Sequence, residues 1–361
     1  MKKIRVIHCV GQLGMGGAET LIVNAFKYID RDHFQFDFLV FNEQQGFYDD
    51  EVRKLGGNIY YLSSLSKVGV YQYIKQLKKF FRQEQPDVVH SHMDWLGGFI
   101  SYAAKQAGVK NMIVHSHANQ RLFENNIISK LLITFNKYLI YRNANQCLAC
   151  SKIAGTSLFM KEFQVLFNGI DTQKYIHPNL KKIQELREEL RIKDDDIILG
   201  TVGSMTINKN HIFLLDIMAE LKKTSNTYKL VLVGNGAEYA NLKQKVKELD
   251  LMDDVVFTGV RSEIPELMNI FDIFLLPSIT EGLGIVLVEA QVSGLPCIVS
   301  IGVPKDVVID EKLVQFLPFD NMKWIENIKQ SLCIKHHQNN DYMKYDIQTT
   351  CKVLEKIYSS K

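Results

Sequence analysis

The sequence contains few cysteines, no long apolar run and little net charge, and each of these absences excludes a class of protein. No run of about 18 apolar residues occurs, so no membrane-spanning helix is expected. Six cysteines in 361 residues favour a reduced, cytoplasmic protein over a disulfide framework. The 43 basic and 40 acidic residues leave a net charge of +3, which argues against a dedicated nucleic-acid binder.

Two local patterns point away from export and from a zinc site. Arg5 and His8 interrupt the apolar run at the N-terminus, which does not suit a signal peptide. Cys147 and Cys150 form a single Cys-x-x-Cys pair within an apolar, strand-like run. Because no second pair accompanies them, we expect two small buried side chains rather than zinc ligands.

Short apolar runs alternate with helical patterns along the chain, which is typical of βαβ units and a parallel sheet. Strands are expected at residues 4–10, 36–41, 59–62, 88–90, 112–115, 146–149 and 165–167. The pattern restarts at residue 197, with strands at 197–202, 229–233, 255–257, 273–276 and 297–300. The sequence therefore predicts an α/β protein of two doubly wound, Rossmann-like domains, which suits its length.

The expected domains are residues 1–170 and 171–341, with residues 168–195 as the crossover. Helices are expected near 18–28, 70–83, 95–107, 125–143, 152–160, 210–223 and 238–249. A last amphipathic helix is expected from about Tyr342 to Tyr358.

Two of the first domain's helical segments are both basic and amphipathic. The segment Tyr71–Arg82 carries four basic residues among apolar ones, and Lys130–Arg142 is similar. Such helices bind membrane surfaces. They are also common as ordinary surface helices with the apolar face in the core, and the pattern leaves both interpretations open.

Ligands of doubly wound sheets bind beyond the carboxyl ends of the strands, so the loops that follow strands are informative. Residues 11–17, which include Gly14, Gly16 and Gly17, follow the first strand and precede a helix. Glycines let the backbone approach a phosphate closely, and a helix N-terminus presents free N–H groups to it. The spacing differs from that of dinucleotide-binding loops, so we expect contact with a phosphate or sugar.

Two His-x-His pairs end two strands of the first domain: His90 with His92, and His115 with His117. Residues two apart on a strand share one face. Such pairs suit either a metal site or a binding site that uses one imidazole.

The first loop of the second domain places Lys209 where a helix begins. A cation there can act on the same anion as the helix N–H groups, an arrangement that suits a diphosphate.

The most specific pattern is the pair Glu281 and Glu289, eight positions apart, around Gly282 and Gly284. A strand leads into this loop and a helix follows it, so the loop's N–H groups can hold phosphate oxygens. Glu289 lies in an apolar run, where a carboxylate is costly unless it is hydrogen-bonded. Two such carboxylates can accept hydrogen bonds from sugar hydroxyls.

Together these motifs resemble those of a GT-B-fold, retaining glycosyltransferase of family 4, and most of all the bacterial enzymes of capsular or exopolysaccharide synthesis. The resemblance extends from about residue 4 to the C-terminus. It includes the loop from Gly14 to Glu19, Val202-Gly203 with Lys209-Asn210, and Glu281-x7-Glu289.

The resemblance implies a sugar nucleotide, with UDP as the expected nucleotide, in an interdomain cleft and mainly on the second domain. Glu289 would bind the ribose hydroxyls. Glu281 would hold the donor sugar together with the backbone N–H groups of Gly282, Leu283, Gly284 and Ile285. The first domain would bind the acceptor, and the last helix, about 342–361, would pack back onto it.

The resemblance also implies the catalytic groups, which are Lys209, Glu281 and His117. Lys209 would neutralise the diphosphate, with N–H groups added by Gly16 and Gly17, and His117 would lie near the reacting sugar. No metal or other cofactor would be required, since the lysine and the helix N-termini take its place.

One residue departs from the family pattern, because Ser204 stands where an arginine is usual. A planar cation for the diphosphate is therefore missing, and Arg261 is the nearest candidate to assist Lys209. The departure leaves open a non-catalytic partner subunit of a glycosyltransferase.

The expected function is transfer of a hexosyl residue from a nucleotide-diphosphate sugar to a lipid- or glycan-linked hydroxyl, with retention of configuration. The expected location is the cytoplasm, and the basic helices leave open an association with the inner face of the cell membrane. A UDP-sugar 2-epimerase-like isomerase and a metal hydrolase built on the histidine pairs are the alternatives.

Overall fold

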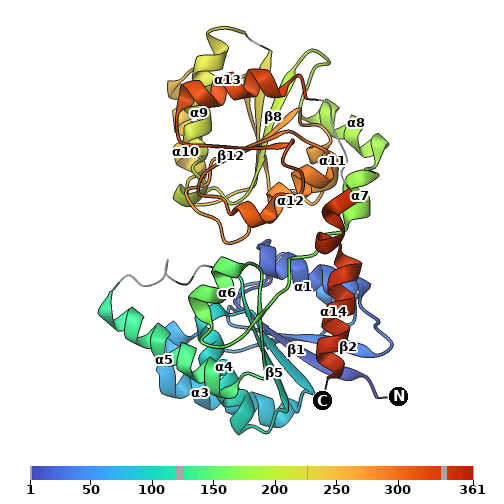
Figure 1. Ribbon diagram of the computed structural model, residues 1–361, viewed down its shortest axis with the longest axis vertical. Coiled ribbons are helices and arrows are strands. Elements are labelled where there is room, and N and C mark those ends of the chain that lie inside the picture. Colours follow the sequence, from blue (N-terminus) through green and yellow to red (C-terminus); the bar gives the residue numbers. More distant parts are fainter. Residues whose placement is uncertain (1, 119, 121–125, 226, 335–339, 361) are drawn as a thin grey trace. The chain divides into compact units, whose positions relative to one another are not determined.

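The structure is a computed structural model that describes residues 2–118, 120, 126–225, 227–334 and 340–360 (Figure 1). The chain forms two compact units. Unit 1 comprises Met1–Ile170 and Lys344–Lys361, and unit 2 comprises Asp171–Met343. No helix in the described residues is both long and apolar enough to cross a membrane.

Unit 1 is built on a seven-stranded, fully parallel sheet. Its strands are β1 (Ile4–Val10), β2 (Phe34–Val40), β3 (Ile59–Tyr61), β4 (Val88–Ser91), β5 (Asn111–Ser116), β6 (Gln146–Ala149) and β7 (Gln164–Val165). The strand order is β3-β2-β1-β4-β5-β6-β7. The chain therefore reverses direction across the sheet between β1 and β4, which is the switch point where such sheets bind ligands.

The helices of unit 1 include the last helix of the chain. They are α1 (Gly17–Tyr28), α2 (Asp49–Lys54), α3 (Leu65–Glu84), α4 (Gly97–Gln106), α5 (Ile127–Asn143), α6 (Lys152–Leu158) and α14 (Ile347–Ser359), with the 3₁₀ turn η1 (Asp94–Leu96). Helix α3 is interrupted at Gly69, whose φ of 73° is left-handed, so its regular basic segment begins after that break.

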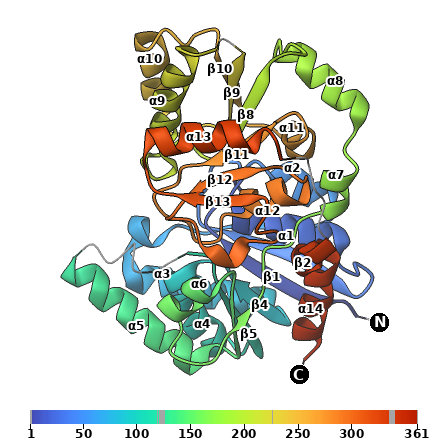
Figure 2. The ribbon, with the colours of Figure 1, turned by 45° about the horizontal axis from the view of Figure 1, so that its top comes forward.

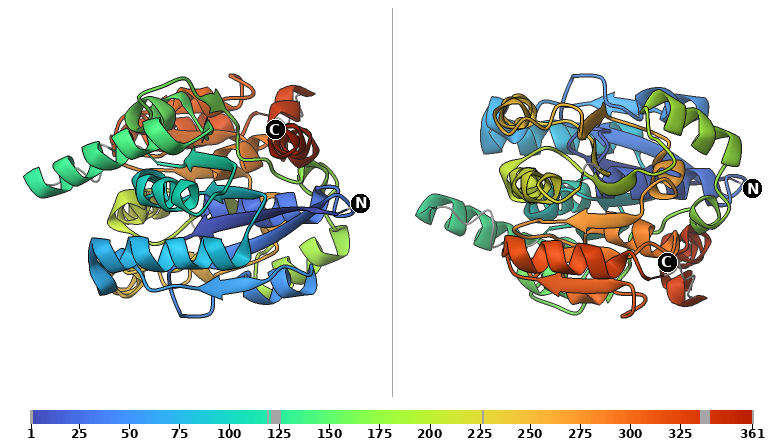
Figure 3. Two further views of the ribbon diagram at one scale, coloured as in Figure 1. Left: turned by 90° about the horizontal axis from the view of Figure 1, so that it is seen from below. Right: turned by 90° about the horizontal axis from the view of Figure 1, so that it is seen from above.

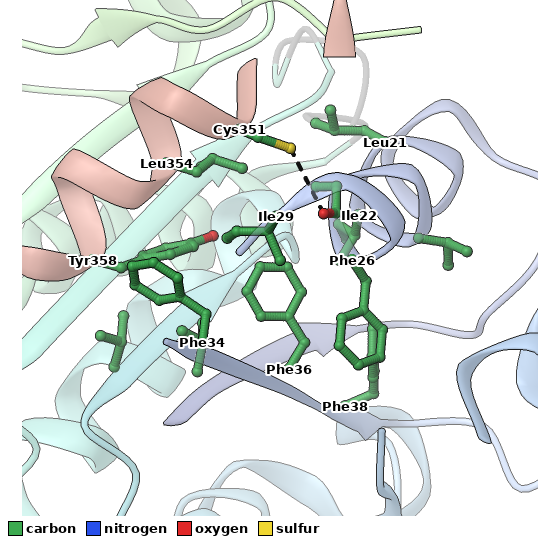
Figure 4. Close-up of a cluster of buried hydrophobic side chains, with 14 of the residues drawn as sticks. Leu21, Ile22, Phe26, Ile29, Phe34, Phe36, Phe38, Cys351, Leu354 and Tyr358 are labelled. Carbon is green, nitrogen blue, oxygen red and sulfur yellow. Dashed lines mark hydrogen bonds between the residues drawn. The ribbon is translucent and has the colours of Figure 1, made fainter. Parts of the chain in front are cut away.

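Helices α1 and α14 pack against each other and cover one face of the unit 1 sheet. Phe26 of α1, Phe36 of β2 and Tyr358 of α14 are buried in one cluster (Figure 4). The rings of Phe26 and Phe36 stack with centroids 5.3 Å apart, and the Cys351 thiol donates to the Ala25 carbonyl. Burying each such aromatic side chain is worth roughly 2–3 kcal/mol, so the C-terminal helix is an integral part of unit 1.

Unit 2 is built on a six-stranded parallel sheet. Its strands are β8 (Ile197–Val202), β9 (Tyr228–Val233), β10 (Val255–Gly259), β11 (Ile273–Leu276), β12 (Cys297–Ser300) and β13 (Val314–Leu317). The order is β10-β9-β8-β11-β12-β13. The switch point of this sheet therefore lies between β8 and β11.

Two groups of helices accompany the unit 2 sheet (Figure 2). One group is α9 (His211–Lys222), α10 (Tyr239–Glu248) and α13 (Asn321–Ser331), and the other is α7 (Thr172–Ile176), α8 (Leu180–Glu189), α11 (Ile264–Met268) and α12 (Ile285–Val292). The 3₁₀ turns are η3 (Ile207–Lys209), η4 (Lys305–Val307) and η5 (Asn340–Tyr345). Trp324 of α13 is fully buried, packs edge-on against Phe213, and donates its indole N–H to the Pro318 carbonyl.

The predicted architecture of two Rossmann-like, doubly wound domains is confirmed. Several elements were missed. The crossover 168–195 contains α7 and α8, and β13, α2, α11 and α13 had no prediction. The last helix begins at Ile347 rather than near 342, because Asp346 caps it by accepting from the Gln348 N–H. The expected strand at 165–167 is shorter, since only Gln164 and Val165 pair with β6.

Candidate active site

The loops that follow β8 and β11 meet at the switch point of the unit 2 sheet. Lys209 ends the turn η3 after β8, and Glu281 lies in the loop after β11. The ammonium of Lys209 and Oε1 of Glu281 are 2.6 Å apart, and both side chains are largely buried. Ser278 donates a second hydrogen bond, also 2.6 Å, to the same carboxylate oxygen. The structure thus pairs two of the predicted catalytic residues.

Backbone contacts hold these two loops together. The Ile279 N–H donates to the Asn208 carbonyl at 2.8 Å, and the Asn208 amide donates to the Thr280 carbonyl, also at 2.8 Å. At Gly302 a Cβ atom would collide with the Ile279 carbonyl, so the β12 loop can approach this closely only without a side chain. The position of the Lys209–Glu281 pair is therefore set mainly by main-chain packing.

The first turn of α12 follows directly after Glu281. Gly284 caps this helix with a left-handed φ of 77° and, having no side chain, leaves the cap without a side-chain acceptor. N–H groups of a first helical turn have no acceptor within the helix and point along its axis. Leu283 and Gly284 are buried and Ile285 is partly buried, so these predicted donors form a compact corner beside Glu281.

Glu289 lies one turn further along α12 and is buried. Burial raises the pKa of its carboxyl to about 7, and a hydrogen bond with Tyr175 of α7 opposes this shift. The side chain that was predicted to bind ribose hydroxyls therefore already has a partner in unit 2. A carboxylate that burial makes costly to ionise gains most from hydroxyl donors.

Arg261, expected to assist Lys209, has other partners. Its guanidinium pairs with the carboxylate of Glu189 on α8 and donates to the Thr258 carbonyl at 3.2 Å. It follows β10, the edge strand, whereas Lys209 and Glu281 follow the central strands β8 and β11. The structure does not bring Arg261 into the cluster, and Ser204 is exposed.

In unit 1 the glycine loop after β1 leads into α1, with Gly16 as the cap residue and Gly17 as the first helical residue. A Cβ at Gly16 would collide with the carboxylate of Glu19, which folds back over this end of the helix. Burial raises the pKa of Glu19, and the charge of Asp94 contributes in the same direction. The N–H groups predicted to hold a phosphate thus have an acidic side chain beside them.

The histidines of unit 1 form one continuous cluster across β1, β4 and β5. His90 pairs in register with His8 of β1, which in the sequence is visible only as an interruption of an apolar run. Nδ1 of His8 is 3.0 Å from Nε2 of His92, and Nδ1 of His92 is 2.9 Å from Nε2 of His117. Both are hydrogen bonds whose direction depends on the ring tautomers. The rings of His115 and His117 lie 4.1 Å apart.

Burial makes these imidazoles neutral. It lowers the pKa of His8 and of His117 to about 3 and lowers the pKa values of His90, His92 and His115 well below the usual range. Neutral imidazoles are the form that binds metals, and two groups of three (His8, His90 and His92; His92, His115 and His117) have ligand atoms within 4.8 Å of one another. The cluster therefore combines neutral imidazoles in metal-ligand proximity with ring nitrogens at hydrogen-bond distance.

Asp94 holds the segment that carries His117, and sequence reasoning missed it. Its carboxylate accepts from the N–H of His117 at 2.8 Å, from the N–H of Ala118 at 3.3 Å and from the Gln120 amide at 3.0 Å. Burial raises the pKa of Asp94 to about 6, and these hydrogen bonds oppose the shift. The only signal was an acidic residue two positions after the first His-x-His pair.

Two doubly wound parallel-sheet units in one chain have the architecture of the GT-B fold. Comparison with known families agrees. The family described as Glycosyltransferase Family 4 matches residues 15–174, and the family described as Glycosyl transferases group 1 matches residues 182–342. The chain belongs to these glycosyltransferases.

Individual relatives extend over nearly the whole chain. A protein of Bacillus subtilis (strain 168) named glycosyltransferase EpsF is 33% identical, covering 98% of this chain and 96% of that protein. The capsular polysaccharide biosynthesis glycosyltransferase CapH of Staphylococcus aureus is 26% identical, covering 99% of each. The crystal structure of Anabaena Alr3699/HepE in complex with UDP and glucose has a TM-score of 0.80 at 18% identity, covering 99% of this chain and 100% of that one.

Proposed function

We propose that this glycosyltransferase moves a hexosyl residue from a UDP-sugar to a lipid- or glycan-linked hydroxyl in cell-surface polysaccharide synthesis, with retention of configuration. The observation that carries the proposal is the Lys209–Glu281 pair at the switch point of unit 2, beside the N-terminus of α12. The similarity to CapH supports a polysaccharide product, and the similarity to a fold crystallised with UDP and glucose supports the donor.

In this proposal the charge of Lys209 stabilises the leaving diphosphate. The bond from the sugar C1 to the diphosphate oxygen breaks, and the acceptor oxygen bonds to C1 on the same face. The acceptor proton passes to the departing diphosphate. Charge develops on that leaving group in the transition state, so a fixed cation and helix N–H groups supply the main stabilisation. This division of roles requires no metal.

The remaining predicted residues bind the two ends of the donor. Glu281 is released from Lys209 by the diphosphate and accepts from sugar hydroxyls, while Glu289 accepts from the ribose. Gly282 to Ile285 contribute backbone N–H groups, Gly16 and Gly17 add others, and His117 contacts the reacting sugar. Arg261 assists Lys209 only if its guanidinium leaves the Glu189 carboxylate and binds the donor instead.

The acceptor side of the proposal rests on α5. Helix α3, the other basic candidate, buries its apolar residues Tyr73, Leu77, Phe80 and Phe81 in the core of unit 1, and so is an ordinary surface helix. Helix α5 instead exposes a row of large apolar side chains on one face: Ile127, Ile128, Leu131, Phe135, Tyr138 and Tyr141. Lys130 and Lys137 flank that row.

Such a face suits the surface of an anionic membrane, where the apolar side chains enter the interface and the lysines meet lipid headgroups. The first turns of α5 project from the rest of unit 1 in every view (Figure 3). We therefore propose that unit 1 docks through α5 on the inner face of the cell membrane, where a lipid-linked acceptor would be available.

Turnover of radiolabelled UDP-sugars into a lipid extract tests the transferase. Lys209→Met should lower kcat/KM by roughly 100-fold or more, the usual effect of removing one stabiliser of a developing charge. Lys223→Met is the matched control, because Lys223 pairs with Glu220 on the surface of the same unit. Equal activity of both variants, or release of an epimerised donor without any acceptor, would overturn the proposal.

Retention is tested separately from transfer. The anomeric configuration of the product linkage, measured by NMR on the isolated glycolipid, should equal that of the donor. An inverted linkage would leave the transferase assignment standing and exclude attack from the same face.

A further inference from the structure

The carboxylate of Glu281 carries two donors on one oxygen and none on the other. Oε1 accepts from the ammonium of Lys209 and from the hydroxyl of Ser278, each at 2.6 Å. Among the residues described, Oε2 has no hydrogen-bond partner. Because a carboxylate oxygen has two lone-pair sites, Oε1 is saturated, and any further donor must approach Oε2.

Ser278 is anchored independently of Lys209. It lies two positions after β11 and is fully buried. Its carbonyl accepts from the hydroxyl of Ser300, the last residue of β12, and that hydroxyl accepts from the Gly302 N–H at 3.3 Å. The backbone that carries the Ser278 hydroxyl is therefore fixed to the neighbouring strand.

The two donors of Glu281 differ in how firmly they belong to its loop. Ser278 lies three positions before Glu281 in the loop after β11, and the Glu281 N–H donates to the Gly302 carbonyl at 3.2 Å. Lys209 comes from the loop after β8 and reaches the carboxylate at the end of a flexible stem. A ligand can thus draw the ammonium away while Ser278 stays beside the carboxylate.

The burial of Glu281 makes the loss of both donors costly. Its side chain is only 11% exposed, and its one ionic partner in the described chain is Lys209. An anion that binds the ammonium competes with the carboxylate for it. A largely buried carboxylate that loses its cation is destabilised unless other hydrogen bonds remain, and the hydroxyl of Ser278 is the remaining side-chain donor.

We propose that Ser278 is a positioning residue that keeps the carboxylate of Glu281 hydrogen-bonded and in place while a diphosphate takes Lys209 from it. The step is an exchange of ion pairs in which no covalent bond changes, and Ser278 donates to Oε1 before and after it. That the anion is a diphosphate rests on the proposed function, whereas the shared oxygen and the two separate anchors do not.

Isothermal titration of the full chain with UDP tests this exchange in three backgrounds. In the wild-type background, Ser278→Ala should weaken UDP binding about tenfold, because the carboxylate that Lys209 leaves has lost its remaining donor. In the Lys209→Met background it should change the affinity by less than about twofold, since no ammonium is withdrawn. In the Glu281→Ala background the change should be equally small, since no carboxylate is left behind.

Ser293→Ala is the matched control. Ser293 is a buried serine of the same unit at the C-cap of α12, and its hydroxyl has no hydrogen-bond partner in the part of the chain that the structure describes. This variant should bind UDP like its parent in every background. Ser278→Cys keeps the shape of the side chain with a weaker donor, so its affinity should lie between those of wild type and Ser278→Ala. Thermal melting of each variant shows that the fold is retained.

Two results would overturn the inference. Equal weakening by Ser278→Ala in all three backgrounds would mean that the serine only supports the loop. Unchanged affinity of Ser278→Ala and Ser278→Cys in the wild-type background would mean that Glu281 needs no donor once Lys209 has left.

Inorganic pyrophosphate as a second probe separates this inference from the proposed function. If pyrophosphate binds with the predicted pattern and UDP does not bind, the exchange stands and the nucleotide donor fails. If UDP binds and the pattern is absent, the donor stands and the role of Ser278 fails. If neither anion binds the wild type, no diphosphate takes Lys209, and both fail.

Discussion

The ammonium of Lys209 and the carboxylate of Glu281 lie 2.6 Å apart although 72 positions separate them in the sequence. They come from loops after neighbouring strands, β8 and β11, at the point where the sheet of unit 2 changes direction. Ser278 binds the same carboxylate oxygen, so Glu281 holds the lysine in place. A cation placed in this way is available to an anion that can displace the carboxylate.

This arrangement predicts that substitutions of Lys209 and of Glu281 have opposite effects on the affinity for UDP. Lys209→Met removes the cation and should weaken UDP binding by about tenfold or more. Glu281→Gln frees the cation from its competitor and should tighten UDP binding severalfold, while it lowers transfer because sugar hydroxyls lose their acceptor. Isothermal titration with UDP measures both. A pair with only a structural role would weaken binding, or leave it unchanged, in both variants.

Glu289 predicts a pH dependence of stability. Burial raises the pKa of its carboxyl from 4.5 in the unfolded chain to about 7 in the native one. The native state therefore binds more protons between these values, so this residue's contribution to stability falls as pH rises through that window. The shift corresponds to at most about 3 kcal/mol at pH 8.

Glu289→Gln should remove this dependence. The variant should melt higher than the wild type at pH 8, with little difference at pH 4.5, and should bind UDP less tightly because an amide is a weaker acceptor for ribose hydroxyls. Glu326→Gln on the surface of α13 is the control. Parallel melting curves of Glu289→Gln and wild type from pH 5 to pH 8 would contradict the assignment.

The loops of the site were predictable from the sequence because glycines and charges follow buried strands there. Gly16, Lys209 and Glu281 all lie after strands, where parallel sheets bind ligands. What the sequence did not show was which of them meet. The Lys209–Glu281 contact depends on main-chain approaches such as that of Gly302 to Ile279, which no side-chain pattern encodes.

The partners of the histidines were equally hidden. His8 lies in the middle of an apolar run, and only the parallel register of β1 with β4 places it beside His90. Tyr358, which binds His90, is 268 positions away and belongs to a helix whose packing sequence periodicity alone cannot locate. The basic helices α3 and α5 also looked alike, because periodicity shows an apolar face but not whether another element covers it.

The hydrogen bonds and backbone conformation of Asp94 predict that Asp94→Ala and Asp94→Asn differ in their free energy of unfolding. Its carboxylate accepts from the N–H groups of His117 and Ala118, and its own φ of 48° is left-handed. Asn retains an acceptor and tolerates that φ, whereas Ala does neither. Asp94→Ala should therefore lower the free energy of unfolding by roughly 1–3 kcal/mol and Asp94→Asn by much less.

Denaturant unfolding of both Asp94 variants measures this difference, and KM for UDP-glucose reports whether the His117 segment has moved. Equal stability of the two variants would mean that the carboxylate does not hold this segment.

The exposed apolar row on α5 predicts that this helix binds membranes, whereas α3 does not. Replacing Ile127, Ile128 and Leu131 with serine removes apolar side chains that are each at least 66% exposed, so the fold should keep its melting temperature. Sedimentation with vesicles containing phosphatidylglycerol should fall severalfold, because burial of these side chains in the interface supplies the binding energy.

Neutralising Lys75, Lys79 and Arg82 on α3 is the matched control, since it alters a helix whose apolar face is already inside unit 1. If electrostatic attraction alone drove vesicle binding, the α3 variant would lose as much binding as the α5 variant. The difference of each variant from the wild type would then disappear at high salt. If the α5 variant sediments with vesicles at wild-type levels, this face binds something other than lipid. A concentration-dependent change in mass by light scattering would then identify that occupant as a second copy of the chain.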